Sequence, residues 1–430
     1  MGIQKKQFDY KWVILVVCFF MEFICLGFCS STAGLYIVPV TEALNIPRSI
    51  YSFSGSIRYI VQVVVAFYFG ALVHRFGIKK LVITGLVALI ASMLIRGWAT
   101  NFVHIYIGSA LLGLGIVFVG GTMAGTIVRR WFHQDIGKYT GIVMSANGIG
   151  GALAAQIVSP IINNGDPFGF RDSYILSALI TLIISVVIII FLKEKPSEGP
   201  VVTGTAKKTP RGTIWVGLDY EDVKRKPYFY LSAAMVFLTG ISLQSIGGIT
   251  IAHMTDIGFP AGVVATMSTI SSLTLTFSKF MVGYTYDKRG LRFTLIVCHI
   301  ATMLAFVLKA TLTDTTAGIL CAAFASALTS LALPLETVMI PLLTNDLFGS
   351  TSYHKVLGVF MAMNSLGLCL GSPLGNVYYD LFGTYVPCFW LFFVLMVVVA
   401  IGWQLVARIA YKDKALLLAA NENNAQIGTN

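Results

Sequence analysis

The sequence GALVHRFGIKK, from Gly70 to Lys80, has a counterpart in GYTYDKRGLRF, from Gly283 to Phe293. Both stretches follow a long apolar segment, and they are 213 positions apart. A second pair, GIVMSANGIG from residue 141 and GVFMAMNSLG from residue 358, shares Gly, Met, Asn and Gly at matching positions with an offset of 217. Two pairs with nearly equal offsets indicate an internal duplication. The sequence therefore predicts a chain built from two repeated halves.

The composition places both halves in a membrane. Of the 430 residues, 56% are hydrophobic and only 11% are charged, and the mean hydropathy is +0.80. Soluble domains are about one-quarter charged. We therefore expect an all-α membrane protein with twelve transmembrane helices in two pseudo-symmetric six-helix bundles. The expected spans lie near residues 12–40, 50–73, 79–99, 102–128, 139–163, 172–192, 228–254, 261–286, 293–311, 315–344, 356–381 and 384–407.

One long polar stretch divides these spans into six and six. It lies between the sixth and seventh spans, and its many charged and polar residues are typical of a linker. The expected domains are an N-terminal bundle over residues 1–192, a cytoplasmic linker over 193–227, a C-terminal bundle over 228–408 and a cytoplasmic tail over 409–430.

The positions of lysine and arginine predict the orientation, because cytoplasmic loops retain positive charge during insertion. With the N-terminus inside, 24 of the 30 lysines and arginines fall on the cytoplasmic side. We therefore expect a multi-pass protein of the plasma membrane or cell inner membrane with both termini cytoplasmic. The net charge of +11 then reflects the membrane orientation. The basic residues are scattered over short loops instead of forming one patch, which argues against nucleic acid as a partner. The sequence does not indicate an oligomeric state. A monomer would be sufficient for function.

Several kinds of chemistry have no counterpart in the sequence. There is no P-loop, no cluster of metal ligands and no nucleophile in register with a base. We expect no enzyme activity, no catalytic residue, no cofactor and no metal. Transport would then take its energy from a gradient.

Lys279 is a cation inside the apolar stretch 261–286, eight residues before Asp287. At a rise of about 1.5 Å per residue it lies about 12 Å inside the cytoplasmic boundary, near the middle of a core about 30 Å thick. Ionisable residues at that depth usually face a bundle interior or aqueous cavity and mark a substrate or ion pathway. We interpret Lys279 as a substrate contact, and the alternative is a permanent ion pair with an acidic partner on another helix.

Two carboxyl groups reach a similar depth, Glu336 in the tenth span and Glu22 in the first. A carboxylate that loses an ammonium partner when an anion arrives can take up a proton, which would couple the two movements. We interpret both as proton-coupling residues. Glu336 could instead form a static bridge or pack in the protonated form, and Glu22 could serve in gating. His253, near the outer end of the seventh span, is a possible relay or a residue facing outside water.

Four more polar residues complete the candidate site. Arg58, in the outer half of the second span, could attract the substrate or serve in gating, or it could be an interhelical or interfacial anchor. Asn147 and Asn364 are related by the repeat, so both are expected to face a central cavity, where an amide suits a carboxylate or an interhelical hydrogen bond. Tyr36 could close the outer end of the cavity or belong to an interfacial belt.

The loop after the second span, a glycine, a basic residue, a glycine and further basic residues, resembles the signature of the major facilitator superfamily. The resemblance covers almost the whole chain and implies the fold of that family. It implies a gating role for the matching residues of the two loops, which are Gly70, Arg75, Gly77, Lys79, Gly283, Asp287 and Arg289. His74 departs from the family, which usually has an acidic residue there, whereas the second copy keeps the acid as Asp287.

Within the superfamily the chain most resembles the oxalate/formate antiporter and monocarboxylate transporter group. LYIVPVTEAL from residue 35, RRWFHQDIGKYTG from 129, the spacing from Lys279 to Gly283, and PLLTNDLFG from 341 carry this resemblance in order. The resemblance implies that the cation at position 279 holds a substrate carboxylate. The oxalate transporters have a second cation in the eleventh span, where this chain has Asn364, and this departure argues against a dicarboxylate.

The sequence thus leads us to expect a secondary active transporter that moves a small organic anion, a monocarboxylate, by alternating access with proton coupling. One alternative is electroneutral anion exchange of the oxalate/formate type, with a counter-anion in place of protons. Another is efflux of a cationic or lipophilic compound, with Glu22 and Glu336 as ligands and Lys279 as their resting partner.

Overall fold

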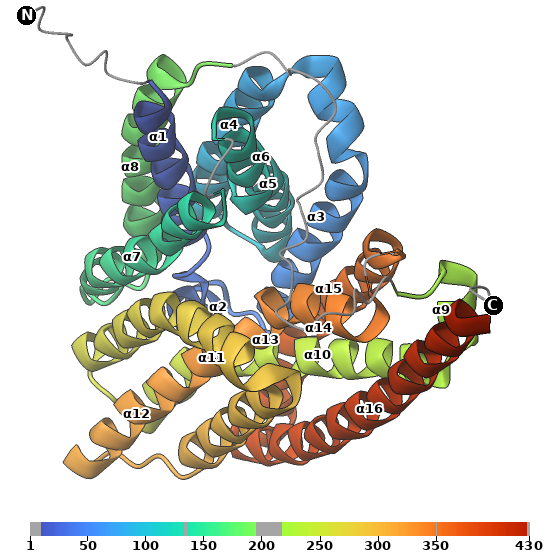
Figure 1. Ribbon diagram of the computed structural model, residues 1–430. Helices are drawn as coiled ribbons and strands as arrows, with labels where there is room; N and C mark the ends of the chain where they lie inside the picture. Colours follow the sequence, from blue (N-terminus) through green and yellow to red (C-terminus); the bar gives the residue numbers. More distant parts are fainter. Residues whose placement is uncertain (1–9, 133–135, 195–216, 350, 428–430) are drawn as a thin grey trace, which may run out of the picture. The chain divides into compact units, whose positions relative to one another are not determined.

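The computed structural model describes residues 10–132, 136–194, 217–349 and 351–427, and every regular element in these ranges is a helix (Figure 1). The all-α prediction is therefore confirmed for the described part. The elements are α1 Lys11–Glu22, the π-helix η1 Phe23–Phe28, the 3₁₀-helix η2 Ala33–Tyr36, α2 Ile37–Leu44, α3 Arg48–Phe76, α4 Ile78–Gly97, α5 Phe102–Val119, α6 Gly121–Trp131, α7 Ile136–Ile162, α8 Gly169–Phe191, α9 Tyr220–Arg225, α10 Pro227–Ile257, α11 Ala261–Ala310, α12 Thr316–Ala332, α13 Pro334–Thr337, α14 Met339–Phe348, α15 Tyr353–Phe382 and α16 Val386–Ile427.

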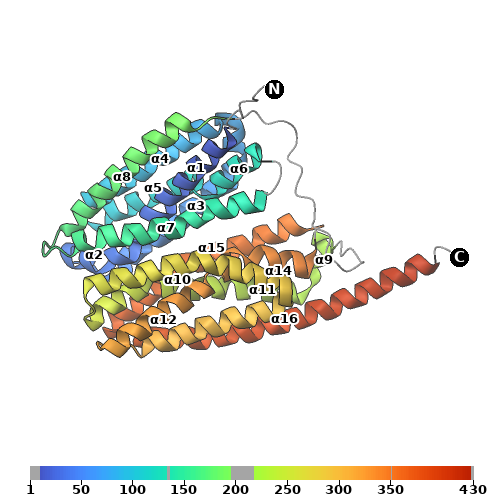
Figure 2. The ribbon, with the colours of Figure 1, turned by 60° about the vertical axis from the view of Figure 1, so that its left-hand side comes forward.

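The helices form two compact units. The first comprises Met1–Pro200 with Pro260–Thr276, and the second comprises Val201–Phe259 with Phe277–Asn430. In the first unit α4 packs against both α5 and α8, and in the second α10 packs against both α15 and α16 (Figures 1 and 2). Most of the expected linker, residues 195–216, lies outside the described residues.

Eleven helices of the described part are long and apolar enough to cross a membrane. The difference from the expected twelve lies in α11, whose 50 residues would extend about 75 Å if straight, more than twice the thickness of a bilayer core. Its course changes at Gly290, which has φ 79°, and Gly77 between α3 and α4 has φ 78°. These two glycines are 213 positions apart, the offset of the sequence repeat. A positive φ is readily available only to glycine, which accounts for its presence at both turns.

Three of the spans are interrupted near their middle. In the first, α1 ends at Glu22 and is followed by η1, four turn residues and η2. In the fourth, Gly120 is extended between α5 and α6, and in the tenth the short α13 separates α12 from α14. Irregular backbone at membrane depth is tolerated where it is buried in protein or lines a water-filled cavity. These breaks therefore point to the functional part of each unit.

Glycine pairs bring helices into close contact next to these breaks. A Cβ on Gly27 of η1 would lie 2.6 Å from Cα of Gly150 on α7, and a Cβ on Gly367 of α15 would lie 3.1 Å from Cα of Gly240 on α10. Gly27 and Gly240 are 213 positions apart, and Gly150 and Gly367 are 217 apart. Both units thus contain the same kind of close crossing, at positions that follow the sequence repeat.

The crossing in the first unit predicts a stability effect. Gly27→Ala places a methyl group against the backbone of α7, where neither helix can move aside cheaply, so we expect a loss of roughly 1–3 kcal/mol. Thermal unfolding of the purified protein in detergent measures this loss. Gly125→Ala on α6 is the matched control, because a Cβ there meets nothing within 4 Å. Equal thermal stability of the two variants would contradict the close crossing.

Candidate functional site

In the first unit the interrupted first span supplies two hydroxyl groups to the predicted site residues. Ser30 and Ser31 lie in the turn between η1 and η2. Arg58 on α3 donates from Nη1 to Ser30 Oγ at 2.8 Å, and its Nε has no hydrogen-bond partner among the described residues. Ser31 Oγ donates to Asn147 Oδ1 on α7 at 3.1 Å. The turn therefore brings Arg58 and Asn147, which the sequence analysis proposed separately, to one segment of backbone.

Ser30 and Ser31 were missed by the sequence analysis. The feature that could have indicated them is the short polar run CSST, from Cys29 to Thr32, within the expected span 12–40. Serine and threonine are common in membrane helices as interhelical hydrogen-bond donors, so this run alone does not distinguish a helix from a break.

Glu22 is buried at the end of α1, immediately before the π-helix. A Cβ built on Gly121 would lie 3.8 Å from its Oε1, so the carboxyl group sits close to the first residue of α6. It is therefore beside the interruptions of two spans, the first and the fourth. The amino-terminal end of a helix favours negative charge, which makes this a suitable position for a carboxylate. A π-helical turn is itself frequent at functional sites.

Tyr36 is engaged with α8. Its hydroxyl group lies 2.7 Å from Ser173 Oγ, and its ring stacks on that of Tyr174 with centroids 4.0 Å apart. Only 2% of Tyr36 is exposed. Its predicted contact with the substrate stays a prediction, and its burial shows that it also holds η2 against α8.

In the second unit Lys279 lies half-buried on α11. Phe277, Phe280 and Tyr284 on the same helix are exposed and, at 3.6 residues per turn, share one face. Lys279 projects from the opposite face. Because the large apolar side chains occupy the exposed face, the ammonium group points away from the surface that suits lipid.

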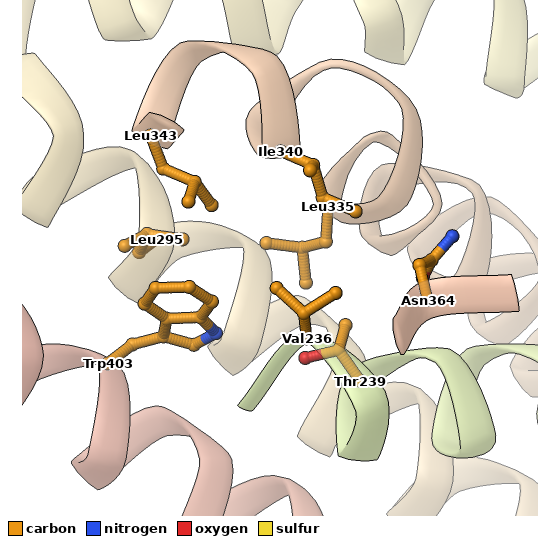
Figure 3. Close-up of a pocket in the computed structure, with 8 residues that line it drawn as sticks. All are labelled: Val236, Thr239, Leu295, Leu335, Ile340, Leu343, Asn364 and Trp403. Atoms are coloured by element: carbon orange, nitrogen blue, oxygen red, sulfur yellow. The ribbon is translucent and has the colours of Figure 1, made fainter. Parts of the chain in front are cut away.

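Asn364 on α15 borders a small cavity in which side chains from six helices converge (Figure 3). The cavity has a volume of about 10 Å³, room for about one water molecule. Asn364 Oδ1 is buried and has no hydrogen-bond partner among the described residues. The other lining residues are Val236, Thr239, Leu295, Leu335, Ile340, Leu343 and Trp403. Asn364, Thr239 and the indole N–H of Trp403 are thus the polar groups of an otherwise apolar space.

Glu336 follows Leu335 of this cavity and belongs to α13, the short helix in the interrupted tenth span. Its Oε1 is buried and has no hydrogen-bond partner in the described part of the chain. A buried polar oxygen without a partner is costly and needs an explanation, such as a transient ligand or a proton. No group of three or more His, Cys, Asp and Glu within the described ranges could hold a metal ion.

His253 and Lys309 form a separate polar cluster among α10, α11 and α12. His253 Nε2 lies 2.9 Å from the carbonyl oxygen of Lys309, and His253 is only 4% exposed. Lys309 is buried as well, and its Nζ donates to Thr250 Oγ1 at 2.8 Å and to Thr329 Oγ1 at 2.6 Å. The alternative that His253 faces outside water is therefore wrong. Its role as a relay stays a prediction.

The family model of the Major Facilitator Superfamily matches residues 16–328 and 233–428, so its two matches together cover almost the whole chain. The chain belongs to the major facilitator superfamily. Members of this family are transporters, which is consistent with the expectation from the sequence.

Known members of the superfamily resemble the chain at low identity. The sialic acid transporter NanX of Escherichia coli is 22% identical over 61% of this chain, and the match spans 62% of that relative's length. Monocarboxylate transporter 13 of Bos taurus is 22% identical over 88% of this chain and 85% of its own length. The predicted resemblance to the monocarboxylate transporters is therefore confirmed. Other similar proteins are named for multidrug resistance or nucleoside transport, so the names differ in what is carried.

A solved structure shares the fold. The crystal structure of the nucleoside transporter NupG has a TM-score of 0.73 to this chain at 15% identity, covering 93% of this chain and 99% of NupG. At this identity the likeness shows the fold alone. The major facilitator fold inferred from the resemblance is confirmed in that sense.

The loop that resembles the superfamily signature is held by an acid from the end of the sixth span. Gly77 is the turn between α3 and α4, and the N–H of the next residue, Ile78, donates to Glu194 Oε1 at 2.8 Å. Arg130 Nη1 lies 3.9 Å from the same oxygen. Glu194 was not among the predicted residues. It supplies the loop with an acidic partner, whereas His74 is exposed.

The remaining predicted gating residues are accessible. Gly70 and Arg75 are exposed and Lys79 is half-buried at the first loop, while Asp287 and Arg289 are exposed and Gly283 is half-buried at the second. Their gating role stays a prediction.

Proposed function

We propose that the chain is a secondary active transporter that moves a small organic anion, a monocarboxylate, across the cytoplasmic membrane by alternating access with proton coupling. The observation that carries the proposal is the placement of Lys279: an ammonium group in the middle of an apolar span, on the face of α11 opposite the exposed apolar side chains. Cations at that depth are kept for substrate or ion pathways. A relative named as a monocarboxylate transporter supports the choice of anion.

The architecture we infer is twelve spans in two repeated bundles with cytoplasmic termini. Gly290 divides α11 as Gly77 divides α3 from α4, which supports counting α11 as two spans. The paired glycine crossings at offsets of 213 and 217 support the repeat. The distribution of lysine and arginine supports the orientation.

The substrate carboxylate would contact Lys279, with Asn364, Asn147, Arg58 and Tyr36 as further ligands. A lysine attracts a carboxylate as a point charge without the fixed fork of arginine, so it tolerates anions of different shape. Asn364 brings a buried amide to the second unit; its N–H groups can donate to an anion, and its Oδ1, which has no partner among the described residues, can accept from a hydroxyl group. The turn carrying Ser30 and Ser31 presents Arg58 and Asn147 in the first.

Proton coupling would fall to Glu336 and Glu22, with His253 as a relay. Glu336 is our first choice, because its buried Oε1 lacks a hydrogen-bond partner among the described residues and its short helix interrupts the tenth span. A carboxylate is expensive to keep ionised in an apolar setting without a counter-charge, so arrival and departure of an anion can change its protonation.

Two other transport modes are compatible with the same residues. Exchange of one organic anion for another would use Lys279 without a proton, and Glu336 would then be a static group. Efflux of a cationic or lipophilic compound would use Glu22 and Glu336 as ligands, and one similar protein is named for multidrug resistance. The sign of the substrate separates the anion proposals from efflux.

Transport by purified protein in liposomes tests the sign of the substrate. We expect radiolabelled monocarboxylates to enter faster than into protein-free liposomes, and dicarboxylates and organic cations of similar size to show no such difference. A preloaded counter-anion shows whether exchange occurs. Protein-dependent transport of the cations but of no carboxylate would refute the proposal in favour of efflux.

A further inference from the structure

An open groove runs along the surface of the second unit between the carboxyl-terminal half of α11 and α16. It has a volume of about 370 Å³, within the range of about 300–1,000 Å³ typical of ligand pockets. Arg292 and Arg408 stand at one end of it, and apolar side chains continue along its length, among them Ile296, Ile300 and Ile401. All three of these isoleucines are exposed. The groove is thus cationic at one end and apolar beyond.

The two arginines have N–H donors available to an anion. Arg292 Nε donates to Gln404 Oε1 at 3.1 Å, and Gln404 Nε2 donates back to the carbonyl oxygen of Arg292 at 3.3 Å, which fixes the first guanidinium across the groove. Within the described ranges neither Arg292 nor Arg408 forms an ion pair with an acidic side chain. Both therefore keep N–H donors available, and guanidinium groups suit phosphate oxygens particularly well.

His299 adds a polar atom at the floor of the groove. It is 1% exposed, its Nδ1 lies 2.6 Å from the carbonyl oxygen of Leu295, and its Nε2 has no hydrogen-bond partner in the described part. It follows Arg292 by seven residues and so lies about 10 Å deeper along the helix. The polar atoms of the groove thus extend from the rim toward the apolar interior, as the phosphate and ester groups of a lipid do.

We propose that this groove binds an anionic phospholipid, with its phosphate on Arg292 and Arg408 and one acyl chain along Ile296, Ile300 and Ile401. The observation that selects this occupant is charge complementarity: two arginines without acidic partners among the described residues stand where two spans end, above an apolar channel between two helices. Basic pockets between membrane helices bind anionic headgroups in this way. The bound lipid bridges the ninth and twelfth expected spans and stabilises their packing. This inference is independent of the transported substrate.

Native mass spectrometry and thermal unfolding of the full chain in neutral detergent test the proposal. Phosphatidylglycerol is titrated in, with phosphatidylcholine and glycerol phosphate in parallel. We expect phosphatidylglycerol to bind and to raise the unfolding temperature, and the other two to do so much less. Removing the charges in the double variant Arg292→Gln/Arg408→Gln should weaken binding roughly 5-fold for each arginine. Lys412→Gln, an exposed cation one turn beyond Arg408, should leave binding unchanged.

Ile401→Trp keeps both arginines and fills the apolar part of the groove, so it serves if the double variant does not fold. We expect it to reduce binding of phosphatidylglycerol as well. Equal binding of phosphatidylcholine, equal protection by glycerol phosphate, or equal weakening by Lys412→Gln would each overturn the proposal. The second of these results would mean that the arginines bind a phosphate ion without the lipid.

Discussion

Lys279→Gln is expected to reduce transport of the organic anion by roughly 100-fold, because it removes the half-buried positive charge that compensates the substrate carboxylate. Glutamine keeps a polar side chain, one atom shorter than lysine, but leaves an anion in an apolar span without a counter-charge. Initial rates of uptake into liposomes at equal protein content measure the effect. The change should appear in transport rather than in folding, so the unfolding temperature is measured on the same preparations.

Two further variants separate the charge of Lys279 from its shape and from the net charge of the protein. Lys279→Arg keeps the charge and should retain part of the transport rate, although its fixed fork will change which acids are preferred. Lys412→Gln removes an exposed cation and should transport like the parent protein. Normal carboxylate transport by Lys279→Gln would exclude Lys279 as the anion contact, and faster transport of an organic cation would favour efflux.

Glu336→Gln is expected to uncouple the anion from the proton. The amide cannot take up or release a proton, so uptake driven by an inward proton gradient should fall to the level without a gradient. Exchange of labelled for unlabelled substrate at equal pH on both sides needs no net proton movement and should continue. The two assays are run on the same proteoliposomes. Relative to the parent protein, gradient-driven uptake should fall by roughly 100-fold, the lower end of what loss of one proton-transfer group produces, while exchange is retained.

An exposed carboxyl group supplies the control for Glu336. Glu42 on α2 is exposed, and Glu42→Gln should leave both assays unchanged. The corresponding Glu22→Gln variant tells whether the coupling is shared between the units. If Glu336→Gln keeps full stimulation by the proton gradient, Glu336 is a structural residue and the coupling lies elsewhere.

The helical character of the chain and much of its internal symmetry could be predicted from the sequence, because both depend on local signals. Apolar length defines a span irrespective of its neighbours, and the two loop stretches kept a glycine at the same place, Gly77 and Gly290. Both have the positive φ that the loop requires. The repeat also located Asn147 and Asn364, one helical turn before the crossing glycines Gly150 and Gly367.

The interruptions of the helices could not be predicted in the same way. The π-helix after Glu22 and the turn with Ser30 and Ser31 lie within a continuous apolar run, where hydropathy is the same for regular and irregular backbone. What decides their conformation is the set of partners on α3 and α7, which the sequence does not place. Pro334 begins the short helix α13, but a proline alone does not show which carboxyl group such a helix will present.

The position of a charged residue along a span does not determine whether its side chain is exposed, as Lys309 shows. It lies near the end of a span, yet its side chain is buried and its ammonium group donates to Thr250 and Thr329. Both threonines donate to a backbone carbonyl of their own helix, and their oxygens still accept from the lysine, so the contact depends only on how the three helices pack. Such clusters arise from tertiary packing, and the backbone carbonyl of Lys309 gives the buried His253 a hydrogen-bond partner.

Accumulation of a labelled monocarboxylate against its own gradient in proteoliposomes is the measurement that tests the central claim most directly. The proton gradient is inward, protein-free liposomes give the passive entry of the protonated acid, and a protonophore collapses the gradient. Protein-dependent accumulation above the passive level, abolished by the protonophore, is the predicted result. If the protein adds nothing to the entry of any carboxylate, with a proton gradient or with a counter-anion inside, organic-anion transport by this chain is contradicted.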